Sequence, residues 1–173
     1  REAAALPSAR IRFSERLERI ARRVGSVPDV VTALETRADL AARFARGEME
    51  SPEEGSGAFR VQRFADESRA GAEAAAMWRE AARLRLLHLG DATGAAAALG
   101  EAARLRPDDL GIRRDRMLAC ELAGDLALAA SEAARILESG VEARHAAPLH
   151  FRIAEDAQSR GDVVGAREAL ANA

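Results

Sequence analysis

The dipeptide Gly-Asp recurs three times in the second half of the chain, and its spacing limits the possible fold more than any other feature. It occurs at Gly90-Asp91, Gly124-Asp125 and Gly161-Asp162, so successive copies are 34 and 37 residues apart. Glycine adopts the left-handed conformation that ends many helices, and aspartate is among the best residues for capping the start of one. Each Gly-Asp is therefore predicted to end one helix and to begin the next.

The residues that follow each Gly-Asp keep one apolar face. Positions five, nine and twelve residues after each glycine are spaced by four and three, which places them on one side of a helix. All nine are apolar: Ala95, Leu99, Ala102, Ala129, Ala133, Ile136, Ala166, Leu170 and Ala173. A single pair of helices cannot bury such a face alone, so about three or more pairs must stack to be stable.

The composition favours an all-α chain. Hydrophobic residues make up 48% of the sequence and aromatic residues only 3%, and there is no tyrosine. Alanine is the best helix former, and leucine, arginine and glutamate rank close behind it. No sustained period-two run of β-branched residues indicates a strand. Alanine, arginine and glycine also have GC-rich codons, which indicates a bacterial source.

With these motifs in place, residues 72–173 resemble about three tetratricopeptide repeats, a family whose period is 34 residues. The best match is residues 90–107, which carry Gly-Asp, three of the apolar positions above, Leu105 and a proline seventeen residues after the glycine. Ile153 and Ala154 match the large-then-small pair of the third unit.

The sequence also departs from the family pattern. Trp78 lies one residue from the usual aromatic position, Arg116 and Met117 replace the large-small pair of the second unit, and residues 140–145 resemble a local insertion. A generic helical solenoid is the nearest competing interpretation. The resemblance implies a right-handed α-solenoid of antiparallel helix pairs, preceded by two N-terminal helices. The predicted division is residues 1–47 as an N-terminal helical pair, 48–57 as a flexible acidic linker and 58–173 as the repeat array.

The N-terminal half contains two predicted helices. The first spans residues 8–24, with Ser8 as N-cap and Gly25 at its end, and its predicted buried stripe is Phe13, Leu17, Ile20, Ala21 and Val24. Six arginines surround this stripe, which is typical of a membrane-surface or nucleic-acid element as well as of a solvated face. The second helix spans residues 28–46, and its predicted buried face is Val31, Leu34, Leu40, Ala41 and Phe44. Residues 59–64 resume apolar spacing and are expected to form either a short helix or the start of a longer one that runs toward Leu89.

Several kinds of chemistry are disfavoured by the sequence. All 26 basic residues are arginine, so phosphate loops and Schiff-base enzymes of the common types, which need a lysine, are excluded unless an arginine replaces it. His145 and His150 are poorly spaced for a shared metal, and His88 and Trp78 are expected to be structural. We therefore expect no catalytic, cofactor-binding or metal-binding residues and no enzymatic activity.

Charge and cysteine content bear on partners and location. The net charge of −2 gives no overall attraction to nucleic acid or anionic membranes. Cys120 is the only cysteine, which excludes an intrachain disulfide, and it is expected to be buried. No apolar run approaches the roughly 20 residues of a membrane span, and no signal peptide is visible. A soluble, cytoplasmic protein is favoured, while a periplasmic location stays open if an upstream signal was removed.

In the family geometry, positions ten, six and three residues before each Gly-Asp glycine face the concave groove. They are Glu80, Leu84, Leu87, Arg114, Leu118, Glu121, Phe151, Glu155 and Gln158. This mixture of apolar and charged groups suits an amphipathic peptide or helix. The leading hypothesis is a protein-interaction scaffold or adaptor. The alternatives are a regulatory or accessory segment of a larger enzyme and, from the N-terminal arginines, an RNA-binding helical array.

Overall fold

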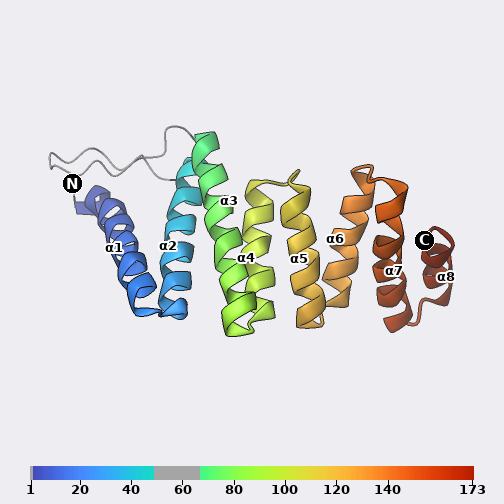
Figure 1. Ribbon diagram of the computed structural model, residues 1–173. Coiled ribbons are helices and arrows are strands. Elements are labelled where there is room, and N and C mark those ends of the chain that lie inside the picture. The colour runs from blue at the N-terminus through green and yellow to red at the C-terminus, as the bar shows by residue number, and fades with distance from the viewer. Residues whose placement is uncertain (1, 49–66) are drawn as a thin grey trace.

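The computed structural model describes residues 2–48 and 67–173, and over these ranges it contains helices and no strands. The helices stand side by side in one elongated row, with the N-terminal helix at one end and the C-terminal helix at the other (Figure 1). The prediction of an all-α fold is therefore confirmed for this part of the chain. None of the described helices is both long and apolar enough to cross a membrane.

The elements follow one another along the row and alternate in direction (Figure 1). Each α-helix packs mainly against the helices before and after it in the sequence. A π-helical turn, η1, continues directly from the third helix. The elements are α1 (Glu2–Val24), α2 (Val27–Ala45), α3 (Glu67–Leu84), η1 (Arg85–Leu89), α4 (Ala92–Leu105), α5 (Leu110–Ala123), α6 (Leu126–Glu138), α7 (Ala143–Ser159) and α8 (Val163–Ala171).

The three Gly-Asp dipeptides form the predicted helix boundaries. Gly90, Gly124 and Gly161 have φ angles of 64°, 78° and 76°, in the left-handed region. The aspartate that follows each glycine accepts a hydrogen bond from the backbone N–H three residues further on, with N···O distances of 2.8, 3.0 and 2.9 Å. Asp109 caps α5 in the same way, by accepting from the N–H groups of Gly111 and Ile112. Each cap satisfies donors that a helix start would otherwise leave without partners.

The predicted apolar face is buried in α4 and α6. Its six positions there, Ala95, Leu99, Ala102, Ala129, Ala133 and Ile136, are all buried in the main core, together with Cys120. The third set differs, because α8 stands at the end of the described row and packs mainly against α7. Ala166 is half-buried, while Leu170 and Ala173 are exposed.

The first helix differs from its prediction in two respects. It begins at Glu2 rather than at Ser8, so Ser8 is not its N-cap, although it ends at Val24 before a left-handed Gly25 as expected. The prediction of its buried residues is mostly wrong, because Ala21 is buried whereas Phe13, Ile20 and Val24 are exposed and Leu17 is half-buried. The helix turns a different side toward α2, the side that carries the small residues Ser14 and Ala21.

The second helix confirms its prediction closely. It ends next to a left-handed Gly47, and its buried residues include Val31, Leu34, Leu40 and Ala41, while Phe44 is half-buried. Of the expected acidic linker only Glu48 is described, and residues 59–64 also lie outside the described ranges. Helix α2 packs directly against α3, so the N-terminal pair continues the row of helices.

Candidate binding face

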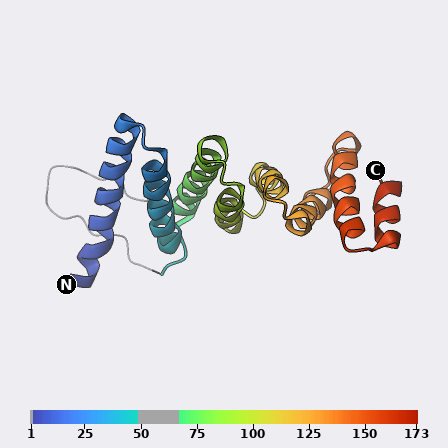
Figure 2. The ribbon, with the colours of Figure 1, turned by 90° about the horizontal axis from the view of Figure 1, so that it is seen from below.

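Two ion pairs show that α3, α5 and α7 lie next to one another. Arg79 Nε of α3 donates to Asp115 Oδ2 of α5 at 2.6 Å. Arg152 of α7 binds the carboxylate of Glu121 on α5 through two nitrogens, and its Nη2 donates to Oε2 at 3.2 Å. Each pair joins two helices that are separated in the sequence by a whole helix. Alternate helices therefore form two layers, which can be followed in the view from below (Figure 2).

Leu118 lies at the centre of the outward surface of α5. It is three residues after Asp115 and three residues before Glu121, which pair with the helices on either side. At about 100° per residue, Leu118 lies between these two flanks and points away from the core. Its side chain is 47% exposed, and Leu122, one turn further, is more exposed still. Arg114, one turn earlier, is exposed on the same side.

The predicted positions on α3 and η1 divide between this surface and the core. Leu87 is exposed, and Glu80 is half-buried. Glu80 accepts hydrogen bonds from Arg83 at 2.9 and 3.1 Å, and these bonds lower the pKa of its carboxyl. Leu84 does not line an open surface, because it is buried in a cluster with Ala21 of α1 and residues of α2. The N-terminal helices cover the side of α3 that would be open in an isolated repeat.

The predicted positions on α7 are all exposed. Phe151, Glu155 and Gln158 lie on the surface of this helix. Arg152 is held next to Phe151, because its Nη1 donates to the Pro148 carbonyl oxygen at 2.7 Å while the same guanidinium binds Glu121. Phe151 thus directly precedes in sequence the residue that joins α7 to α5.

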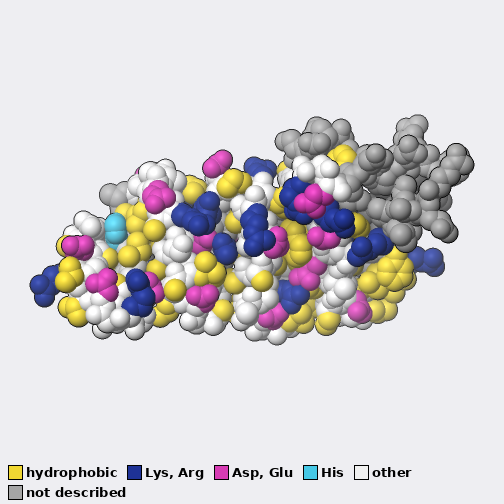
Figure 3. Space-filling view, turned by 180° about the vertical axis from the view of Figure 1, so that it is seen from behind, with side chains coloured by type: hydrophobic (Ala, Val, Ile, Leu, Met, Phe, Trp, Pro, Cys, Tyr) yellow, Lys and Arg dark blue, Asp and Glu magenta, His cyan; other side chains and the backbone are white. Residues whose placement is uncertain are grey.

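The outward surface of α3, η1, α5 and α7 is named the α3/α5/α7 face below. Its exposed apolar residues are Leu87, Leu118, Leu122 and Phe151. Spacing from the Gly-Asp dipeptides predicted three of these and missed Leu122, which the i, i+4 relation to Leu118 could have indicated. On the opposite side of the molecule, basic, acidic and hydrophobic side chains are interspersed (Figure 3).

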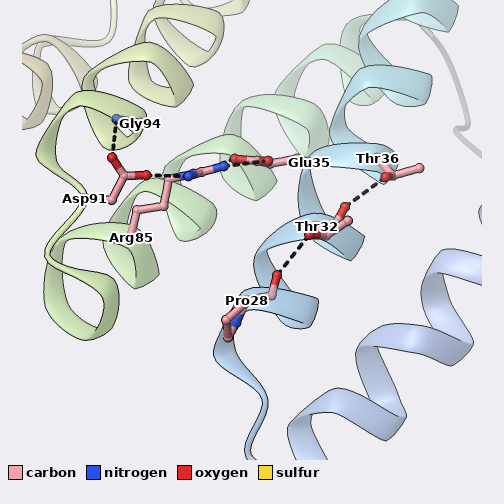
Figure 4. Close-up of polar contacts among 7 residues, drawn as sticks. All are labelled: Pro28, Thr32, Glu35, Thr36, Arg85, Asp91 and Gly94. Carbon is pink, nitrogen blue, oxygen red and sulfur yellow. Dashed lines mark hydrogen bonds and ion pairs between the residues drawn. The ribbon is translucent and has the colours of Figure 1, made fainter.

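A second group of charges ties α2 to η1 and α4. Arg85 donates to both carboxylate oxygens of Glu35, at 2.8 and 3.0 Å, and to Asp91 Oδ2 at 2.5 Å (Figure 4). The other oxygen of Asp91 caps α4 through the Gly94 N–H. This hydrogen bond and the nearby Arg85 lower the pKa of Asp91, and the bonds to Glu35 raise the pKa of Arg85. The Thr32 hydroxyl, seen in the same view, donates only to a carbonyl of its own helix.

The structure of the described residues bears on two further kinds of chemistry, metal binding and thiol reactivity. No group of three or more His, Cys, Asp and Glu side chains within residues 2–48 and 67–173 is placed to hold a metal ion. Burial raises the pKa of the Cys120 thiol, which disfavours the reactive thiolate. Trp78 is half-buried against the main core, in agreement with the packing role expected for it.

Comparison with known proteins adds no assignment. Neither the models of known protein families nor the curated proteins contain a match to this chain.

Proposed function

We propose that the chain is a non-enzymatic scaffold or adaptor that holds an amphipathic peptide or helix of a partner protein on the α3/α5/α7 face. The observation that carries this proposal is that Leu87, Leu118 and Phe151, one from each unit among the predicted groove positions, are exposed apolar side chains on elements of one layer. We further propose that the helices form a right-handed, tetratricopeptide-like array, which the 34-residue period and the Asp caps support.

Apolar contact would supply most of the affinity. Full burial of a leucine or phenylalanine side chain contributes about 1.5–3 kcal/mol. Because Leu118, Leu122 and Phe151 are 47%, 71% and 54% exposed, each would contribute about 1–2 kcal/mol on binding. Their sum of roughly 3–6 kcal/mol only matches the low end of the ~4–15 kcal/mol cost of association, so the apolar side chains that the partner buries in the same contact must supply the surplus.

The charged residues of the face would determine the register of the bound segment. Arg114, one turn before Leu118 on α5, and Glu155, one turn after Phe151 on α7, are exposed and have opposite charges. A bound helix with an acidic group near Arg114 and a basic group near Glu155 would be favoured in one direction over the other. Arg79 and Arg152 already have carboxylate partners within the chain, so they would act as a fixed support.

The proposal can be tested by selecting peptides that bind the full chain from a displayed library and measuring their affinity for single variants. Leu118→Glu is expected to weaken binding by more than about tenfold, because a central apolar contact is lost and a charge is placed against it. Leu126→Glu is the matched control, since Leu126 is an exposed leucine of the other layer. Equal affinity of the selected peptides for the wild type and for Leu118→Glu would contradict the proposal.

A further inference from the structure

One side of α1, about a quarter turn from the side that contacts α2, carries an uncovered apolar stripe. Phe13, Ile20 and Val24 are 69%, 49% and 71% exposed. Their spacing of seven and four residues places them within about 40° of one another around the helix. The stripe extends over about 16 Å, since a helix rises about 1.5 Å per residue. The length of the stripe is thus similar to that of the contact between two packed helices of moderate length.

One edge of this stripe is strongly basic. The exposed residues Arg12, Arg16, Arg19 and Arg23 follow that edge, and none has a hydrogen bond or ion pair to another described residue. A shallow hollow between the stripe and the arginines is lined by Ile20 and three of the arginines: Arg16, Arg19 and Arg23. The nearby carboxylate of Glu18 does not neutralise them, because it pairs with Arg22 and with Arg37 of α2.

Contacts between helices inside the row indicate which side chains would pair with the arginines of α1. At several contacts between helices, small apolar side chains pack together while an arginine of one helix binds a carboxylate of its neighbour. These pairs are Arg37–Glu18 between α1 and α2, Arg85–Glu35 between η1 and α2, Arg113–Glu132 between α5 and α6, and Arg152–Glu121 between α7 and α5. The outer face of α1 carries the apolar residues and the arginines of such a contact without the carboxylates.

We propose that the outer face of α1 is a second docking surface, which binds an amphipathic helix of a partner protein whose apolar stripe is bordered by Asp or Glu. The partner helix would pack alongside α1 as one more helix of the row. Its apolar side chains would cover Phe13, Ile20 and Val24, and its carboxylates would pair with Arg16 and Arg23. This surface is separate from the α3/α5/α7 face.

A helix explains this face better than other anionic partners do. Binding of nucleic acid would use the arginines but would leave Phe13, Ile20 and Val24 in water. A membrane-surface helix normally buries a broad apolar face below its basic residues. Here the apolar stripe is only as wide as a helix-helix contact, and four of the arginines lie along one edge, as at the contacts inside the row.

The test uses the full chain and a labelled synthetic helical peptide of Leu, Ala and Glu, about 16 residues long, with leucines on one stripe and glutamates beside it. Fluorescence anisotropy should show binding of this peptide, and a control peptide with arginine in place of glutamate should not bind. Arg16→Gln with Arg23→Gln is expected to weaken binding about 2- to 30-fold, since each exposed ion pair contributes modestly. Arg104→Gln, an exposed arginine on α4, is the matched control and should change nothing.

Two further variants make the outcome decisive. Arg16→Glu with Arg23→Glu should reverse the preference, so that the arginine peptide binds and the glutamate peptide does not. Leu118→Glu should leave binding unchanged, which separates this surface from the α3/α5/α7 face. Because the substituted side chains are exposed, circular dichroism should show that all variants keep the helical fold.

Three results would overturn the proposal. The first is equal binding of the glutamate peptide to the wild type and to Arg16→Gln with Arg23→Gln. The second is no binding of that peptide together with binding of vesicles of phosphatidylcholine and phosphatidylserine in a ratio of about 7:3, which would identify a membrane surface. The third is no binding of the peptide together with salt-sensitive binding of a single-stranded RNA, which would identify a nucleic-acid surface.

Discussion

Glu132 is the most informative residue for testing how the helices are held together. Its side chain is 0% exposed, and it lies on α6 facing α5. Its carboxylate accepts hydrogen bonds from Arg113 Nη1 at 3.0 Å and from Arg116 Nη1 at 2.6 Å. Arg116 also lies against Gly100 of α4, where a Cβ would come within 3.4 Å of its guanidinium. One buried carboxylate therefore links three consecutive helices.

We expect Glu132→Gln to destabilise the protein by about 3 kcal/mol. The amide keeps the volume of the side chain, so no cavity forms, but two largely buried guanidinium groups lose their counter-charge. Removing one member of a buried ion pair typically costs about 3–5 kcal/mol, and the partial exposure of both arginines places this case at the lower end. For a chain of this length the change corresponds to a fall in Tm of about 6–12 °C.

The assay is urea unfolding followed by far-UV circular dichroism, with Glu101→Gln as the control. Glu101 forms an exposed ion pair with Arg104, and its loss should cost less than about 0.5 kcal/mol. Replacing Glu132, Arg113 and Arg116 together by leucine or methionine should recover most of the stability lost in Glu132→Gln, because no unpaired charge is then left buried. A loss for Glu132→Gln no larger than that for Glu101→Gln would refute the reasoning.

Three further predictions concern the helix ends and the thiol. Asp91→Ala should lower the free energy of unfolding by about 1 kcal/mol through loss of the cap. Because the pKa of Asp91 is lowered in the folded state, the carboxylate stabilises the fold above its ordinary pKa, and this stabilisation is lost as the pH falls through the lowered, folded-state pKa. The Tm difference between the variant and the wild type should therefore shrink below about pH 4. Gly124→Ala should cost about 1 kcal/mol in urea unfolding, because a Cβ is strained at a φ of 78°; an unchanged midpoint would contradict this. Cys120 should react with an aromatic disulfide at pH 8 only as fast as the protein opens, because its thiol is buried and its pKa is raised; reaction at the rate of a free thiol, followed by absorbance, would disprove it.

The helix boundaries were predictable because their causes are local. Gly90 and Asp91 lie next to each other, and the glycine conformation and the aspartate cap need no distant partner. The same holds for Gly124-Asp125 and Gly161-Asp162. The apolar face of α4 and α6 was predictable as well, since a spacing of four and three residues is a property of one helix.

The orientation of α1 was not predictable by the same means. Its apolar residues form a genuine stripe, yet Phe13 and Val24 are exposed, and the helix turns the side with the buried residues Ser14 and Ala21 toward its neighbour. Small residues allow close approach of two helices, and that advantage depends on the shape of the partner rather than on the periodicity of α1. Leu84 was wrongly assigned to the groove for a related reason. It is buried by α1 and α2, which lie outside the repeat pattern from which the assignment was made.

The buried charges were also beyond sequence reasoning. Arg116 was recognised as a departure from the repeat pattern, but nothing in its neighbours showed that a carboxylate sixteen residues later would meet it. The pairing depends on how α5 and α6 turn toward each other and on the space beside Gly100. Likewise the groove positions were predicted from spacing alone, while the burial of Leu84 and the ion pairs that join α3, α5 and α7 became visible only in the structure.

The arginine content and the alanine-rich contacts have a common explanation. Alanine side chains let helices pack closely but bury little apolar area each, so every contact between helices needs a further source of stability. The long arginine stem covers apolar surface, and its planar head binds a carboxylate at two points, which the single ammonium of lysine cannot do. Inside the row, Arg85 and Arg152 bind carboxylates of other helices in this way, and Arg113 binds the carboxylate of Glu132 on α6 through one nitrogen. By the same physical logic, the arginines on the outer face of α1 favour a helix that brings carboxylates of its own.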